Sequence, residues 1–405
     1  MASLDRRWLA VVAWVAVIYT TIPSVRAVRE WFIARWDASL IGWGVAAAVV
    51  VAAAVAAAGL GRRPGGLHWS DRLWIAGAAV LLLFWTYSLR RRPEEAVHLL
   101  EYGLLAVLLH RALRSSLRDT TVFVVGALIG ALVGTVDEVI QWLSPSRTWD
   151  WRDLVLNGGA GALVQLALWR VLPSCAQPPQ PRSWRPVLRL AATLTALLTL
   201  CLANTPQRVA TWAPAVGLPH LTSSLNPMAE YGLLHSAPGL GAFASRLTLA
   251  ELAEQDRTRA SEVAAVLEAS RHSYGRFLDT WPVADDPFTY EARVHLFSRD
   301  RNLGKARKAG FEGAAARQQT TVAWFENQIL ERYFGHTLAA SPYRWRTRQL
   351  TSVEAARDPD RRLTSAVGSH LITFATERQL RALLLIVIGL LLVADLALSR
   401  YHRTL

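Results

Sequence analysis

A series of apolar segments, each close to the length that crosses a lipid bilayer, constrains this chain more than any other feature. A helix needs about 20 predominantly apolar residues to span the hydrocarbon core. The candidate segments are residues 8–22, 40–60, 73–89, 96–113, 121–143, 154–172, 187–203 and 380–398. They predict an all-α polytopic membrane helix bundle with about eight transmembrane helices.

Composition supports a chain that is only partly membrane-embedded. It is 52% hydrophobic with a formal net charge of +13, which is too apolar for an ordinary soluble protein and too polar for one lying wholly in lipid. Almost all basic residues are arginines, and many of them flank apolar segments, as in membrane proteins generally. No basic stripe predicts nucleic-acid binding. Cys175 and Cys201 lack partners at metal-binding or disulfide spacing, so we expect neither a zinc site nor a disulfide framework.

The alternation of apolar and polar segments predicts six parts. A stretch rich in Pro, Gln and Ser is typical of a linker, and the long polar stretch before the last apolar segment is large enough for one domain. The parts are N-terminal transmembrane helices (1–92), a transmembrane core (93–172), the linker (173–186), a further transmembrane helix (187–203), a mainly helical soluble domain (204–379), and a C-terminal transmembrane helix and tail (380–405).

Eight membrane crossings would place both termini on the same side. The arginines of the short loops favour that side as cytoplasmic, so we expect the 204–379 domain to be extracytoplasmic. The first segment follows Arg6 and Arg7 and lacks a small-residue cleavage site, so we interpret it as an uncleaved anchor rather than a signal peptide. The expected location is the bacterial cytoplasmic (inner) membrane, with several crossings.

Three polar clusters interrupt the apolar segments of the 93–172 core. An ionisable group inside a bilayer costs several kcal/mol unless it is paired or lines a wet cavity, so such groups mark functional sites by default. The chain crosses the membrane twice between the first cluster and the last, which places all three at one membrane face. The clusters are His98, Glu101 and Tyr102; Asp137, Glu138 and Gln141; and Arg147, Asp150, Asp153 and Asn157.

Helical spacing places each cluster on one face of its helix. His98, Glu101 and Tyr102 are spaced i, i+3 and i+4, and residues at this spacing are neighbours on a helix surface. The guanidinium of Arg147 presents a planar donor fork that suits a carboxylate or a phosphate. Carboxylates beside a histidine can support acid/base chemistry, or they can form an ion-pair network that only holds the helices together. No metal-ligand spacing is recognisable, and we expect no metal and no other cofactor.

The three clusters form one compound motif with a defined order. It comprises His98-x-x-Glu101-Tyr102-Gly103-x-Leu105, then Asp137-Glu138-x-x-Gln141, then Arg147 with Asp150, Asp153, Leu154, Asn157 and Gly158. In order and spacing this motif resembles the VanZ-like family of integral membrane proteins. The resemblance extends over residues 93–169, less than a fifth of the chain.

The resemblance implies an envelope-linked role, because the family is named for a protein associated with low-level resistance to the glycopeptide teicoplanin. It brings no established reaction. One position departs from the family pattern: the family often has Glu-x-His-Gln where this chain has Ile140 before Gln141. The segments 40–60 and 73–89 also lengthen the small core usual in the family.

Local patterns predict several elements in the 204–379 domain. Thr248-Leu-Ala-Glu251 is a capping box that opens an amphipathic helix. Alternation of Glu291, Arg293 and His295 predicts a short strand, and a helical run is expected over residues 306–334. The pentapeptide Glu-Tyr-Gly-Leu-Leu occurs at 101–105 and again at 230–234, and we draw no inference from the second copy.

Our leading hypothesis is an envelope protein that binds a polar or anionic group at the outer membrane face. The ligand would be a lipid headgroup, a lipid-linked cell-wall precursor or a glycopeptide-sensitive precursor, held by the ten cluster residues. One alternative is an intramembrane enzyme acting on a lipid-linked substrate, with Glu138 or Asp153 as base and His98 as acid. Another is a scaffold whose 204–379 domain recruits a partner. The sequence leaves the oligomeric state open.

Overall fold

The chain divides into two compact units. The first, which we call the bundle unit, comprises Met1–Leu200 and Ala382–Leu405, and the second unit comprises Cys201–Arg381. The computed structural model describes residues 5–62, 66, 68–145, 147–172, 179–222, 228–237, 241–361 and 363–401. Cys175 and residues 173–178 of the predicted linker lie outside the described residues.

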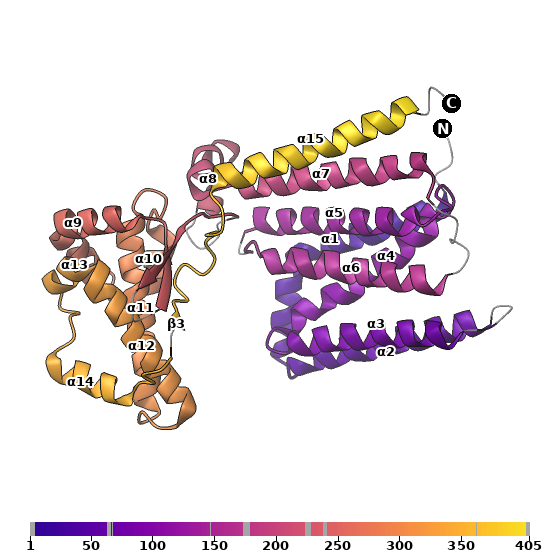
Figure 1. Ribbon diagram of the computed structural model, residues 1–405. Helices are drawn as coiled ribbons and strands as arrows, with labels where there is room; N and C mark the ends of the chain where they lie inside the picture. Colours follow the sequence, from indigo (N-terminus) through magenta and orange to yellow (C-terminus); the bar gives the residue numbers. More distant parts are fainter. Residues whose placement is uncertain are drawn as a thin grey trace. The chain divides into compact units, whose positions relative to one another are not determined.

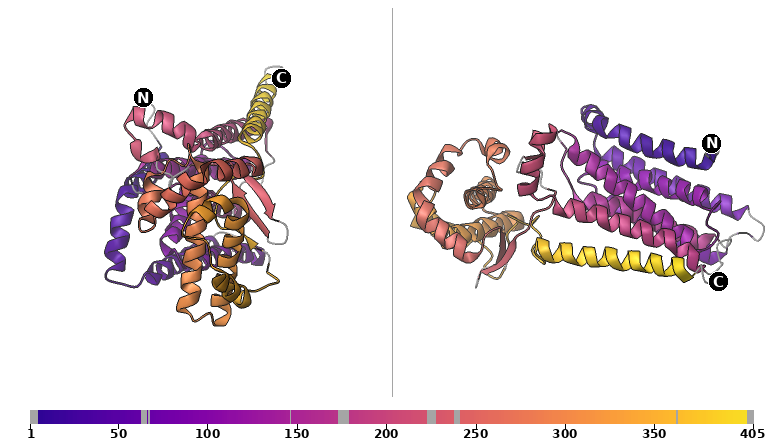
Figure 2. Two further views of the ribbon diagram at one scale, coloured as in Figure 1. Left: turned by 90° about the vertical axis from the view of Figure 1, so that its left-hand side faces the viewer. Right: turned by 90° about the horizontal axis from the view of Figure 1, so that it is seen from above.

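The bundle unit is built from long helices that run roughly along a common direction (Figure 1 and Figure 2). Its centre is α4, which contacts α1, α5 and α6 and buries Leu99, Leu105 and Leu109 among them. The helices are α1 (Arg6–Ile33), α2 (Ser39–Gly61), α3 (Trp69–Ser88), α4 (Val97–Leu113), α5 (Thr121–Leu143), α6 (Trp151–Val171), α7 (Trp184–Ala203) and α15 (Glu377–Tyr401), with the short 3-10 helices η1 (Pro93–Ala96) and η3 (Pro181–Ser183).

Seven helices among the described residues are long and apolar enough to cross a membrane, as in a multi-pass membrane protein. They are Arg6–Val25, Ser39–Gly61, Pro93–Leu113, Thr121–Leu143, Trp151–Val171, Pro181–Ala203 and Glu377–Arg400.

The predicted span 73–89 forms helix α3 but is not among these seven. Asp71 and Arg72 stand in the first turn of α3, and they lower the hydropathy of a helix that is only 20 residues long. The predicted number of eight crossings is therefore not confirmed. The placement of both termini on one side depends on that number and stays a prediction.

The helix that follows the predicted linker begins earlier than the sequence indicated. We expected the linker to reach Pro186, whereas α7 begins at Trp184. Pro186 lies in the first turn, where a proline is tolerated because the N–H groups there have no helical partner.

Helix α7 is joined to α15 by two ion pairs. Arg185 and Arg189 of α7 both donate to Asp395 of α15, at 2.9 and 3.1 Å. This pairing offsets the cost of an acid within an apolar helix.

Helices α5 and α6 approach closely because glycines of α5 face polar side chains of α6. A Cβ added at Gly134 would lie 2.8 Å from Cβ of Asn157, and one added at Gly126 would lie 2.4 Å from Nε2 of Gln165. Gln165 spans the interface further and donates to the Ala106 carbonyl of α4 at 2.8 Å. The glycines thus allow polar groups of α6 to reach the centre of the bundle.

We expect Gly134→Ala to lower the free energy of unfolding by about 1–3 kcal/mol, because the added methyl overlaps Asn157 and overpacks the interface. Gly130→Ala is the matched control, since its Cβ would meet nothing within 4 Å and alanine is the better helix former. Thermal unfolding of the detergent-solubilised protein measures both. Equal unfolding midpoints for the two variants would contradict the proposed close packing.

The second unit is mainly helical with one small sheet. In the sheet β1 pairs antiparallel with β2, and β2 pairs parallel with β3. Its core is an apolar cluster that includes Phe243, Leu252, Phe288 and Phe325. The elements are α8 (Pro206–Trp212), η4 (Pro214–Val216), η5 (Pro219–Thr222), β1 (Leu233–Ala237), β2 (Gly241–Ser245), α9 (Leu249–Ala269), α10 (Tyr274–Thr280), α11 (Pro287–Lys308), α12 (Gly313–Tyr333), α13 (Gly335–Ala340), α14 (Thr347–Ala356) and β3 (Leu363–Thr364).

Two local predictions in this unit can be compared with the structure directly. The capping box is confirmed: Thr248 accepts from the Glu251 backbone N–H at 3.2 Å, and Glu251 accepts from the Thr248 N–H at 2.8 Å. The predicted strand at residues 291–297 is wrong, because this segment lies within α11. Asp286 caps that helix and Pro287 occupies its first turn, a strong start signal.

The polar alternation in α11 reflects buried hydrogen bonding rather than a strand. Glu291 and His295 are four residues apart and therefore share a helix face; both are buried, against Ser245 and Glu326 respectively. Arg293 points to a different neighbour, Ser270, at 2.9 Å. The spacing of these residues in the sequence could not show that they bind partners on different segments, so it could not distinguish a buried helix from an alternating strand.

The helix predicted over residues 306–334 is two helices. Helix α11 ends at Lys308 and α12 begins at Gly313. Gly310 and Phe311, between the two helices, have positive φ angles of 63° and 62°, and Gly313, the first residue of α12, has φ of 82°. A helix cannot continue through left-handed backbone, so the chain turns and α12 packs against α11.

A buried ion-pair network joins the sheet to α11. Arg246 lies between Glu230 and Glu291, donating to Glu291 at 3.2 Å and also to Glu230. His370 reaches Glu230 at 2.9 Å. Burial alone would raise the pKa of Glu230, but the His370 hydrogen bond and the Arg246 charge together hold that pKa below its ordinary value.

We expect acid to weaken the second unit through Glu230. A carboxylate with a lowered folded-state pKa adds stability above its unfolded pKa, about 4.3, and that stability is lost as the pH falls through the folded value. Calorimetric unfolding between about pH 6 and 3 should therefore show a smaller acid dependence in Glu230→Gln than in the native chain. Identical pH profiles would count against this role.

Candidate functional site

The three polar clusters meet at one end of the bundle unit. Helix α4 begins there, α5 ends there and α6 begins there. The Tyr102 hydroxyl of α4 donates to Asp137 of α5 at 2.9 Å, and the Asp150 backbone N–H donates to Glu138 at 2.7 Å. The chain reverses between successive helices, which is why segments 50 residues apart come together.

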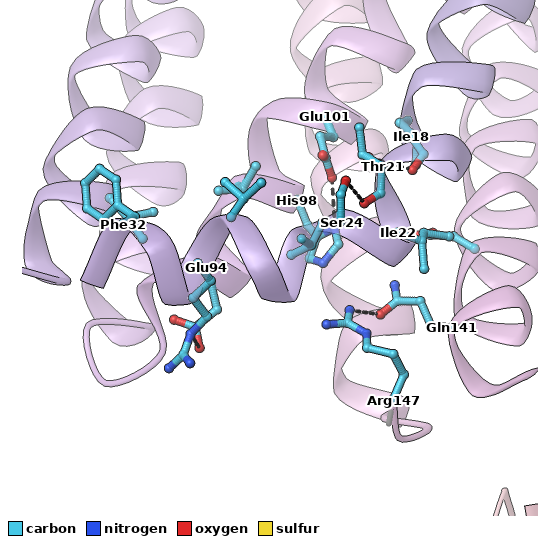
Figure 3. A pocket seen from close by; sticks show the side chains of 16 residues that line it. Ile18, Thr21, Ile22, Ser24, Phe32, Glu94, His98, Glu101, Gln141 and Arg147 are labelled. Atoms are coloured by element: carbon cyan, nitrogen blue, oxygen red, sulfur yellow. Dashed lines mark hydrogen bonds and ion pairs between the residues drawn. The ribbon is translucent and has the colours of Figure 1, made fainter. Parts of the chain in front are cut away.

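A cavity of about 360 Å³ opens beside these helix ends. Figure 3 shows side chains from α1, α4 and α5, together with Arg147, arranged around it. Five of the predicted residues line the cavity: His98, Glu101, Asp137, Gln141 and Arg147.

The polar part of the cavity is organised by two contacts. His98 Nδ1 lies 3.0 Å from Glu101 Oε2, and the two side chains are only 18% and 23% exposed. Arg147 donates through Nη2 to the Gln141 amide oxygen (Figure 3). This contact orients the guanidinium.

The other predicted residues lie behind the cavity rather than on its surface. Tyr102 and Glu138 are buried, Asp150 is the N-cap of α6 with its side chain accepting from the Arg152 N–H at 2.8 Å, and Asp153 stands in the first turn. Asn157 is fully buried against Gly134. These residues hold the three helix ends together and shape the cavity from behind.

Several buried polar atoms in this group form no hydrogen bond with the described part of the chain. They are Asp137 Oδ1, Glu138 Oε2, Asp153 Oδ1 and both side-chain heteroatoms of Asn157. A buried polar group without a partner costs about 1–3 kcal/mol. The protein side chains of this group therefore leave part of its hydrogen-bonding capacity unused.

Helix α1 forms part of the site, which the three polar clusters did not predict. Ile18, Ile22, Val25, Val28 and Phe32 of this helix line the cavity, and the Ile41 and Val97 side chains extend the apolar surface.

Three contacts fix α1 in that position. Arg29 pairs with Glu94 at 2.9 Å, Trp14 donates to the Glu101 carbonyl at 3.0 Å, and Tyr19 donates to the Val133 carbonyl at 3.0 Å. A signal was present in the sequence, because polar residues that include Thr21, Ser24 and Arg29 interrupt the apolar sequence of this helix.

Among the described residues, no three His, Cys, Asp or Glu side chains are arranged to hold a metal ion. Comparison of the chain with family models, with curated proteins and with solved structures finds no match. The fold and the site together describe a multi-pass helical membrane protein with a cavity lined by both apolar and charged side chains.

We expect Tyr102→Phe to lower the free energy of unfolding by about 1–3 kcal/mol. The substitution removes the one hydrogen bond that Tyr102 gives Asp137, a buried carboxylate whose other oxygen is unpartnered, and such a loss costs this much. Tyr87→Phe is the control, because the Tyr87 side chain is 64% exposed. Thermal unfolding in detergent measures both, and an equal shift in the two variants would contradict the argument.

Proposed function

We propose that the cavity of the bundle unit binds the headgroup of a membrane lipid or of a lipid-linked cell-wall precursor. The observation that carries this proposal is the division of the cavity into two parts. Apolar side chains of α1 line much of one side, together with Thr21, Ser24 and the Arg29–Glu94 ion pair. The polar part is lined by His98, Glu101, Asp137, Gln141 and Arg147. A molecule with a hydrocarbon chain and a polar head matches both parts.

The headgroup end would act through charge and hydrogen bonding. The Arg147 guanidinium suits a phosphate or carboxylate. The His98–Glu101 pair can accept or donate a proton as the headgroup enters. The unpartnered oxygen of Asp137, which lines the cavity, can accept a hydrogen bond from a headgroup hydroxyl or amine.

Binding is favoured over catalysis by the positions of the acids. Glu138 and Asp153, the bases considered for an intramembrane reaction, are not among the residues that line the cavity. A general base must come within hydrogen-bonding reach of the proton that it removes.

The motif similarity to VanZ-like proteins extends the proposal to the cell envelope. We place the protein in the bacterial cytoplasmic membrane, with the cavity at the outer face and the second unit as a soluble, extracytoplasmic domain. In this arrangement the ligand is a lipid or cell-wall precursor of the outer leaflet. A link to glycopeptide (teicoplanin) resistance follows if the ligand is the precursor.

We expect Arg147→Ala and Val25→Trp each to reduce the amount of lipid that co-purifies with the protein by about tenfold. Arg147→Ala removes a charge-assisted contact with the headgroup, and Val25→Trp fills the space beside the apolar residues of α1. Arg90→Ala and Val17→Trp are the controls, since both side chains are exposed and neither lines the cavity. Native mass spectrometry of the detergent-extracted protein measures the bound lipid.

Growth assays supply a second measurement. Arg147→Ala and Glu101→Ala should abolish any difference in glycopeptide or detergent sensitivity that the native protein confers, while both variants still insert in the membrane. If Arg147→Ala and Val25→Trp retain as much bound lipid as the unsubstituted protein, the proposal is refuted. Conversion of a labelled lipid to product by the purified protein would show that the cavity is a catalytic site rather than a binding site.

A further inference from the structure

A second cavity lies within the second unit, remote in sequence from the clusters described above. It has a volume of about 360 Å³ and is lined by residues from the end of α11, from the turn that follows it, and from α14 with the residue before it. Its lining residues are Arg307, Phe311, Arg346, Arg348, Gln349, Ser352 and Val353.

Three of these seven lining residues are arginines, and none is a carboxylate. Among the described residues, no ion pair joins Arg307, Arg346 or Arg348 to an acid, whereas the neighbouring Arg344 and Arg357 pair with Glu331 and Glu354. Elsewhere in this unit, Arg246 and Arg259 each bind carboxylates. Three cations around one hollow repel one another, and an anion placed among them would relieve that repulsion.

The cavity holds one of its arginines in a defined orientation. With the Gln349 amide oriented so that its oxygen faces the neighbouring donors, that oxygen accepts from Arg307 Nη2 at 3.2 Å and from Trp345 Nε1 at 3.1 Å. This contact directs the guanidinium but leaves its positive charge uncompensated, because the amide is neutral.

The floor of the cavity is apolar and includes a strained residue. Phe311 and Val353 belong to a small cluster with Leu303 and Trp345. Phe311 has φ of 62° and is the one non-glycine residue with positive φ in the described part of the chain. A bulky residue in this region costs about 1–3 kcal/mol, and such outliers gather at functional sites.

We propose that this cavity is a binding site for a phosphate or diphosphate group carried by a compact organic molecule. The guanidinium fork matches phosphate oxygens in pairs, and the apolar floor faces the rest of the ligand. The volume falls in the range of small-ligand pockets, about 300–1,000 Å³. The site is independent of the cavity in the bundle unit, so either can fail without the other.

The test uses the full-length protein in detergent with inorganic pyrophosphate as the probe. We expect saturable binding by calorimetry that weakens as salt increases. Arg348→Gln should weaken it about tenfold or more, and Gln349→Glu should abolish it by placing a carboxylate beside Arg307. Arg317→Gln is the matched control, since Arg317 is exposed and does not line the cavity.

Absence of saturable pyrophosphate binding would overturn the proposal, as would an equal loss in Arg317→Gln. Unchanged thermal unfolding of Arg348→Gln and Gln349→Glu would show that lost binding is not lost folding. If either variant unfolds early, Arg346→Gln provides an independent exposed substitution in the same cavity.

A second arm distinguishes a free phosphate compound from a lipid headgroup. The protein is reconstituted in nanodiscs of phosphatidylcholine, with or without phosphatidylglycerol. Competition between phosphatidylglycerol and pyrophosphate, removed by Arg348→Gln, would identify a lipid headgroup as the source of the anion. Equal pyrophosphate affinity in both kinds of disc would identify a soluble phosphate compound.

Discussion

The packing of α4, α5 and α6 around buried polar groups is the constraint on which the bundle unit depends. In a low-dielectric interior an unpaired polar group raises the free energy of the folded state, because it has lost its hydration. Tyr102 pairs with Asp137, and the Asp150 backbone N–H pairs with Glu138. Gly134 makes this possible by letting Asn157 lie directly against the α5 backbone. These contacts draw three helix ends together, and the cavity exists because they converge.

The cavity is not simply the meeting point of the motif residues. Its apolar wall comes from α1, which Arg29, Trp14 and Tyr19 hold in place. The motif residues thus provide the charged end, and a helix outside the motif provides the surface that a hydrocarbon chain would contact. Carboxylate oxygens without a protein partner lie near the charged end.

The second unit uses its arginines in two ways. Arg246 is buried between two carboxylates, and removing one member of such a set is costly because the others remain charged and unpaired. The arginines around the second cavity instead share a hollow lined by no acid. The first arrangement stabilises the fold, whereas the second retains a positive potential that a ligand can use.

The sequence by itself determined the helical class, most of the apolar helices and the grouping of the polar clusters at one end of the bundle. Each follows from local rules: segment length, hydropathy, helical spacing and the number of chain reversals between clusters. Only the tertiary structure decided that α1 forms a wall of the site, that Glu138 and Asp153 lie behind it, and that residues 291–297 are helical. Those outcomes depend on which side chains meet across distant segments. Tyr19 with Val133 and His295 with Glu326 are such meetings, and no local pattern encodes them.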